Sequence, residues 1–317
     1  MAVHAAQSAQ QRELLFKSSA LPGIFVPAWA SGYIAGAIAL RHAPPLTLLT
    51  LRFGVAALVL LVLALAMRAP WPRKPRAIVH IVVAGLLSQA LQFGCAYEGV
   101  YEGASPALAA LIIGLMPILI GAASGPLLGE RLGRAQWFGL TLGFGGVALA
   151  VAQRLNAANL SEGRAVALVV FGLLGLTAGT LYQKRFAAQM DVRTGGFLQA
   201  AVSALTLGGL SIFVEHTRID VVPEFAVAMA WLIVVNSLGG ITMMYVMIRT
   251  GEANRVASLF YLIPPVAAAM SALVLHERFS PLVLAGFVVA SAGVYYAARR
   301  HKPHKTNVTT TSWSEQT

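Results

Sequence analysis

The chain has 317 residues, of which 57% are hydrophobic and only 11% are charged, and its formal net charge at pH 7 is +11. A mean hydropathy of +0.72 excludes a water-soluble globule and predicts a protein that lives in a lipid bilayer. The Lys and Arg residues cluster in short segments between apolar runs, where they determine topology, so no nucleic-acid partner is expected.

Ten apolar runs follow one another along the chain, each close to the about 20 residues that a helix needs to cross a hydrocarbon core. They cover roughly 21–40, 46–66, 77–96, 104–123, 135–151, 165–181, 195–213, 226–247, 256–275 and 282–298. Because lipid offers the backbone no hydrogen-bond partners, each run is predicted to be a helix. Arg12 and Lys17 precede the first run as in a signal peptide, but its length and the prolines within it favour a retained span.

The second half of the chain repeats the first at one constant offset. Pro117, Glu130 and Gly139 recur 147 residues later as Pro264, Glu277 and Gly286. A unit with five spans gives two halves of opposite orientation, an architecture typical of transporters. The predicted fold class is therefore an all-α integral membrane protein with ten transmembrane helices in two inverted five-helix repeats.

The domain limits follow from the runs. They are a cytoplasmic N-terminal segment (1–20), a first repeat (21–152), a linker (153–164), a second repeat (165–299) and a cytoplasmic tail (300–317). Most loop Lys and Arg residues fall on one side if the N-terminus is inside, so both termini are predicted to be cytoplasmic in a multi-pass protein.

Several motifs resemble a known family. The run from Gly103 to Pro117 followed by Leu128-Gly-Glu-Arg-Leu132, and the second copy Tyr261-Leu-Ile-Pro264 with His276-Glu-Arg278, are similar to the EamA-type domain of the drug/metabolite transporter superfamily. The resemblance implies a ten-helix carrier of the bacterial inner membrane that usually exports amino acids or other small metabolites without ATP hydrolysis. The sequence itself has no Gly-rich phosphate loop with a following Lys-Ser/Thr, and no cofactor is expected.

A pair of amides indicates the substrate pathway. Gln89 and Gln92 share a face of the third predicted helix, and the repeat offset places Gln89 on Asn236 of the eighth. Polar groups at equivalent positions in both halves predict two sides of one cavity. The alternative is interhelical hydrogen bonding, which contributes about 0.6 to 2 kcal/mol in any bundle, and the sequence leaves both open.

Aromatic and thioether side chains near the same level extend this pathway: Trp29, Tyr97, Met244 and Tyr261. Flat rings with polar tips suit an amphipathic solute, although interface anchoring and packing are the alternatives. Arg52 is the one charge clearly inside an apolar run, which makes it a candidate substrate contact. Its side chain is also long enough to snorkel towards the outer interface, and its repeat mate is the neutral Gln199.

The recurring prolines and glutamates have other expected roles. Pro117 and Pro264 each remove a backbone hydrogen bond and are predicted to kink their helices, where they act as gating hinges. Glu130 and Glu277 each stand beside an Arg at a helix end, which favours a structural role through ion pairing.

The sequence thus predicts a secondary carrier that exports a small amphipathic metabolite, with an amino acid as a candidate, by alternating access. Uptake of a metabolite or vitamin is the alternative, and a channel or sensor is the alternative class. An enzyme is not expected, because no Ser-His dyad or metal-spaced ligand set is found, so no catalytic or metal residues are predicted. The expected partners are a small-molecule substrate and the lipid bilayer, and a homo-oligomer is left open.

Overall fold

In the computed structural model every element is a helix within the residues that the structure describes, which are 20–128, 134–155, 160–215, 219–240, 243, 259 and 262–298. The helices of the first repeat are α2 (Ala20–Ala39), α3 (Pro45–Ala66), α4 (Pro75–Gly85), η1 (Leu86–Leu91), α5 (Gln92–Tyr101), α6 (Pro106–Ile113), α7 (Met116–Leu128) and α8 (Arg134–Leu155). Those of the second are α9 (Leu160–Phe186), α10 (Val192–Val214), α11 (Pro223–Trp231), η2 (Leu232–Gly240), α14 (Ile263–Val274) and α15 (Pro281–Ala298).

All ten apolar runs coincide with these helices over the parts that the structure describes. Six helical stretches are long and apolar enough to cross a membrane, and four shorter apolar helices account for the first, fifth, ninth and tenth runs. The third run is continuous through α4, η1 and α5, and the eighth through α11 and η2. The prediction of an all-α integral membrane protein is confirmed.

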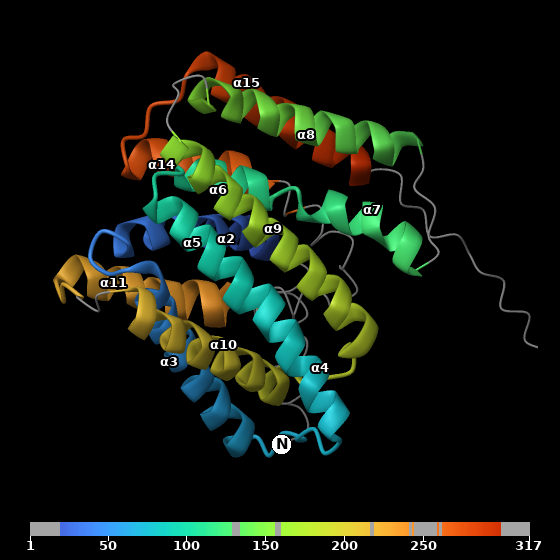
Figure 1. Ribbon diagram of the computed structural model, residues 1–317, viewed down its shortest axis with the longest axis vertical. Helices are drawn as coiled ribbons and strands as arrows, with labels where there is room; N and C mark the ends of the chain where they lie inside the picture. Colours follow the sequence, from blue (N-terminus) through green and yellow to red (C-terminus); the bar gives the residue numbers. More distant parts are fainter. Residues whose placement is uncertain are drawn as a thin grey trace, which may run out of the picture.

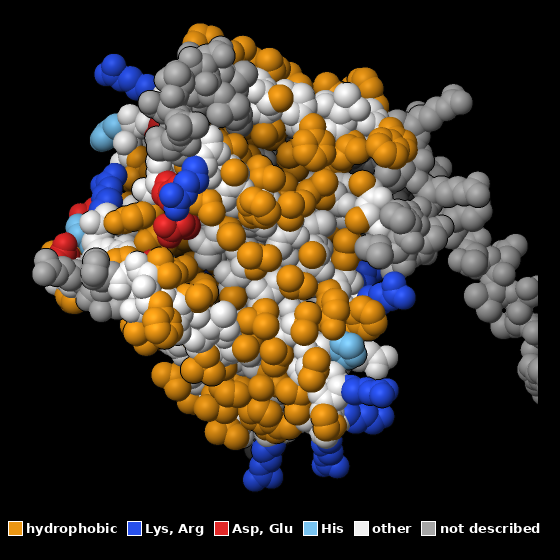
Figure 2. Space-filling view, viewed as in Figure 1, with side chains coloured by type: hydrophobic (Ala, Val, Ile, Leu, Met, Phe, Trp, Pro, Cys, Tyr) orange, Lys and Arg blue, Asp and Glu red, His pale blue; other side chains and the backbone are white. Residues whose placement is uncertain are grey.

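The outer surface is strongly apolar. Hydrophobic side chains cover broad areas of the face shown in Figure 2, while Lys and Arg gather towards its edges. Leu58, Val62, Leu205 and Phe213 are all more than 60% exposed. Because a soluble protein rarely exposes contiguous apolar patches of this extent, these faces are the ones that meet lipid.

Equivalent helices of the two repeats run antiparallel, which confirms the inversion. The start of α3 meets the end of α10 where Thr47 contacts Glu215, and the far end of the same pair meets where Thr194 donates to the Pro70 carbonyl. The fifth and tenth helices, α8 and α15, also lie side by side (Figure 1). Gly146 lies against Gly286 in this pair, while Gly293 lies against Gly143.

The first helix of each repeat packs mainly on the other repeat. α2 contacts α11, η2 and α14, whereas α9 runs along α4, η1 and α5 and also touches α6 and α7 (Figure 1). The two repeats thus exchange their first helices. The apolar core shows this, because Phe25 and Ala30 of α2 are buried with Ile263 and Ala267 of α14. Neither repeat therefore forms a closed bundle without the other.

Candidate functional site

The third and eighth spans each pass through a π-helical segment at equivalent positions. The repeat offset of 147 carries η1 (Leu86–Leu91) onto residues 233–238, inside η2 (Leu232–Gly240). π-helical turns are rare and occur frequently at functional sites. These two segments hold the two predicted amides, Gln89 and Asn236.

Asn236 binds the backbone of the first span. Its Nδ2 donates to the carbonyl oxygens of Ala28 at 3.0 Å and Trp29 at 3.2 Å. Gly32 makes room for this approach, because a Cβ there would lie 2.8 Å from the Asn236 Cγ. The Oδ1 of Asn236 is buried and finds no hydrogen-bond donor within the described ranges.

Gln89 also has a buried side-chain oxygen without a donor among the described residues. Its Nε2 approaches the Oε1 of Gln199 at 3.5 Å, the outer limit of a hydrogen bond, and its own Oε1 is buried with no donor among the residues that the structure describes. Gln199 also donates to Gln183 of α9 at 3.1 Å. A buried polar group without a partner costs about 1 to 3 kcal/mol, so two such oxygens at equivalent positions call for a ligand or water.

Arg52 lies between the third and eighth spans. Its side chain is buried, with Nε donating to Ser237 Oγ at 3.2 Å and Nη1 donating to Tyr97 Oη at 2.9 Å. The guanidinium carbon stands 4.8 Å from the ring centroid of Phe93 and 5.8 Å from that of Phe53. The side chain is thus turned into the bundle instead of snorkelling out of it.

The remaining predicted pathway residues that the structure describes lie on α2 and α5, and their role stays a prediction. The Trp29 ring packs on Gly240 and stands 5.4 Å from the Phe25 ring centroid. Tyr97 reaches α2 at Gly36, and Gln92 is buried at the start of α5. Met244 and Tyr261 lie outside the described residues.

The prolines do not stand in mid-helix. Pro117 is the second residue of α7 and Pro264 the second of α14, positions where the missing N–H leaves no helical carbonyl unpaired. The fourth span is interrupted just before Pro117, between Ile113 and Met116. The kink predicted at Pro117 is thus corrected to a break between α6 and α7, while residues 260–261, before α14, lie outside the described part. The gating role stays a prediction.

Of the two motif glutamates, Glu277 lies in the described part of the chain. Glu277 follows α14 and accepts a hydrogen bond from the Ser271 hydroxyl, which ties the chain after the helix back to its last turn. Glu130 lies outside the described residues. Their structural role stays a prediction.

Sequence reasoning missed the neighbours that shape the site. Ser237 and Phe93, which hold Arg52, and Gly32, which admits Asn236, were not singled out. The repeat itself carries a signal for the glycine, because the offset places Gly32 on Gly179. A Cβ on Gly179 would lie 2.7 Å from the Ser88 backbone nitrogen, so this glycine admits η1 as Gly32 admits η2.

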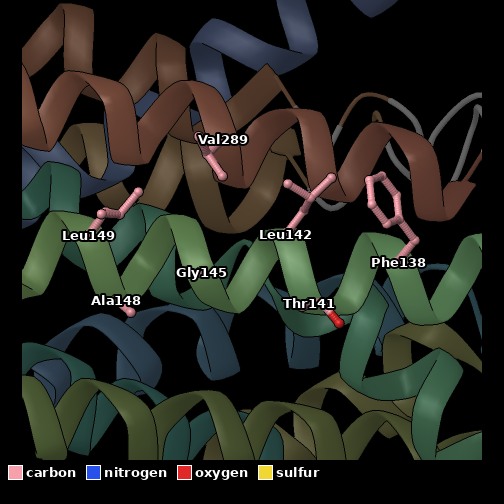
Figure 3. A pocket seen from close by; sticks show the side chains of 7 residues that line it. All are labelled: Phe138, Thr141, Leu142, Gly145, Ala148, Leu149 and Val289. Carbon is pink, nitrogen blue, oxygen red and sulfur yellow. The ribbon is translucent and has the colours of Figure 1, made fainter.

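An apolar groove of about 520 Å³ lies elsewhere, on α8 beside α15 (Figure 3). It is lined by Phe138, Thr141, Leu142, Gly145, Ala148, Leu149 and Val289. The Thr141 hydroxyl donates to its own helix, at the Trp137 carbonyl. The groove shares no residue with the surroundings of Arg52, and its lining suits lipid. As for metals, no three His, Cys, Asp or Glu side chains come together within the described part of the chain.

Comparison with known proteins identifies the family. The EamA-like transporter family matches residues 23–152 and again 163–299. An uncharacterized transporter of Bacillus subtilis, YvbV, is 25% identical over 91% of this chain and 94% of its own. Proteins called "Probable amino-acid metabolite efflux pump" from Escherichia coli and Salmonella typhimurium are 25% and 24% identical, each over 88% of this chain and 94% of their own.

One solved crystal structure supports the fold independently. It superposes with a TM-score of 0.62 over 89% of this chain and 98% of the other, at 19% sequence identity. At this identity the likeness shows the fold alone.

Proposed function

The chain belongs to the EamA-like transporter family, and we propose that it is a secondary transporter that exports a small amphipathic metabolite, with an amino acid as the first candidate. The relatives named for amino-acid metabolite efflux support this substrate class and direction. We place the protein in a bacterial inner membrane with both termini in the cytoplasm, as the Lys and Arg of the loops favour.

The observation that carries the proposal is the pair of equivalent π-helical segments. Each brings an amide into the bundle, and each amide keeps a buried oxygen unpaired among the described residues. A solute with N–H or O–H donors would satisfy these oxygens while bound. Because hydrogen bonds to buried groups discriminate strongly between partners, the same oxygens would select the solute.

The fold supports alternating access as the mechanism. Two inverted halves that exchange their first helices can rock about a shared site while the pairs α3 with α10 and α8 with α15 hold the periphery. Trp29, Gln92 and Tyr97 would line the path beside the amides.

The test is transport by purified protein in liposomes loaded with a mixed metabolite pool, followed by mass spectrometry of the released solutes. We expect selective, saturable release of one solute class, and its loss in a Gln89→Ala/Asn236→Ala double variant that remains folded. The matched control is Thr177→Ala/Thr180→Ala, since among the described residues those hydroxyls bond only to carbonyls of their own helix, Leu173 and Leu176.

Three other results would contradict the proposal. Non-saturating flux would indicate a channel. No release by wild type under any imposed ion gradient would favour a sensor. Accumulation of external solute against its gradient, without export, would favour the uptake alternative.

A further inference from the structure

One positive charge stands inside the bundle without a counter-charge among the residues that the structure describes. Arg52 is 6% exposed and lies seven residues into α3, about 10 Å along the helix at ~1.5 Å per residue. The ion pairs formed between described residues involve Arg41, His42, Arg164 and Arg193, and none includes Arg52. An isolated buried charge is costly, so its retention calls for a partner.

The described protein groups that contact Arg52 are neutral. Ser237 and Tyr97 take one N–H each from Nε and Nη1, and the rings of Phe93 and Phe53 flank the guanidinium. Of the five N–H groups of an Arg side chain, the second on Nη1 and both on Nη2 have no acceptor among the described residues. These three N–H groups remain to donate to an acceptor, and a guanidinium binds a carboxylate in bidentate fashion.

The acidic group that meets the start of α3, Glu215, is already hydrogen-bonded. Glu215 accepts hydrogen bonds from the backbone nitrogens of Leu46 and Thr47 and from the Thr47 hydroxyl. It thereby caps the start of α3, where Pro44 provides no side-chain cap. Both of its carboxylate oxygens are occupied about a turn and a half from Arg52.

The equivalent position in the second repeat confirms that the charge is single. Gln199 is also buried, but it is neutral, and protein groups engage its amide: Gln89, Gln183 and the Met190 sulfur. At this pair of equivalent positions, a cation is therefore present in the first repeat and a neutral amide in the second. A single unneutralised charge matches a monoanion better than a phosphate dianion.

We infer that Arg52 is the anchor for a carboxylate on the transported solute. This inference rests on the proposed function and narrows its substrate class to solutes that carry a carboxylate, as amino acids and small organic acids do. Because Arg52 bridges Tyr97 of the third span and Ser237 of the eighth, a carboxylate bound there would be held between the two repeats. In carriers built from inverted repeats, the substrate site lies at this interface.

The experiment compares leucine and phenylalanine with their carboxamides, all loaded at equal concentration into proteoliposomes, with protein-free liposomes subtracted. A charge-assisted hydrogen bond contributes about 1.5 to 3 kcal/mol, so we expect wild type to release the two amino acids about tenfold or more faster than the carboxamides. Arg52→Gln should bring this ratio close to one by slowing the amino acids. Arg52→Lys should keep part of it, because a point charge replaces the bidentate fork.

The matched control is Arg41→Gln. Arg41 is exposed, precedes the same helix and pairs with Glu224, so its loss should leave the ratio unchanged. If wild type releases carboxamides as fast as amino acids, the anchor is refuted while the carrier stands. If it releases nothing, the proposed function itself fails. Should Arg52→Gln not fold, as judged by gel filtration, the wild-type ratio and Arg52→Lys still decide.

Discussion

The inverted repeat builds two regions that differ in what lies between their helices. One is the contact between α8 and α15, here called the seam, and the other is the surroundings of η1 and η2. At the seam, backbone meets backbone: a Cβ on Gly146 would lie 2.6 Å from the Gly286 carbonyl oxygen. Around the π-helical segments, side-chain amides and a guanidinium fill the space, and some of their polar groups are unpaired within the described residues. The comparison indicates a rigid frame beside an adaptable interior.

The largest expected effect is at the seam, with Gly146→Ala. The added methyl group would clash with the backbone of Ala290 and Gly286, which cannot move as a side chain can. We expect a loss of stability of about 1 to 3 kcal/mol or more, measured as a lower thermal unfolding temperature in detergent.

The neighbouring glycine provides the control for that variant. A Cβ on Gly145 would meet nothing within 4 Å, so Gly145→Ala should unfold at the wild-type temperature or slightly above it. Equal destabilisation by both substitutions would mean that α8 and α15 do not meet backbone to backbone.

The next largest effect is expected for Gly32→Ala, at a glycine that faces a side chain instead of backbone. Here the new methyl group would meet the Asn236 side chain, which can rotate away at the expense of its bonds to Ala28 and Trp29. We expect a stability loss of about 1 kcal/mol, the net contribution of a typical hydrogen bond, but a large fall in transport. Stability by thermal unfolding and release from proteoliposomes would be measured on the same preparation. Unchanged transport would argue against Asn236 as a site residue.

A still smaller stability effect is expected for Gln89→Met, which conserves volume. It removes the amide whose oxygen is buried and unpaired among described residues, at the expense of one long contact to Gln199. Since replacing an unsatisfied polar group by an apolar one of similar shape is nearly neutral or stabilising, the unfolding temperature should hold while transport falls. A clear drop in unfolding temperature would show that Gln89 is needed for the structure.

The last expected effect is on stability alone and is found at the N-cap of α10. Hydrogen bonds from the Arg193 side chain, the largest cause, and from nearby backbone nitrogens hold the pKa of Asp191 below its usual range. A carboxylate with a lowered folded-state pKa stabilises the protein above its unfolded-state pKa, about 3.9, and that contribution is lost as the pH falls through the folded-state value. Asp191→Asn should therefore lower the unfolding temperature at pH 7 by an amount equivalent to less than about 1 kcal/mol. The difference in unfolding temperature between variant and wild type should decrease below about pH 4. A difference that does not depend on pH would exclude this role of the charge.

Much of the fold was predictable because a bilayer allows few solutions. The apolar runs mark helices, and the constant offset between Pro117 and Pro264 marks the inverted repeat. The amides Gln89 and Asn236 were found by applying that offset to polar residues. The same step would have found Gly32 and Gly179, had it been applied to glycines.

Other features leave no mark in the sequence. A π-helical segment is defined by which carbonyl each N–H meets, so the composition of η1 and η2 does not reveal it. The prolines predict a kink, but they do not say that α6 ends at Ile113 and that a new helix begins at Met116. The exchange of first helices depends on which surfaces fit, and the positions of the apolar residues in α2 do not encode its partner.

That exchange has a consequence for biosynthesis. When α2 leaves the ribosome, α11, η2 and α14, on which it mainly packs, do not yet exist. At about 5 to 20 residues per second, Asn236 follows Ala28 by on the order of ten seconds or more. Through that interval the first helix must wait in lipid, or with the insertion machinery, for the amide that binds its carbonyls, so assembly of the transporter is completed only near the end of translation.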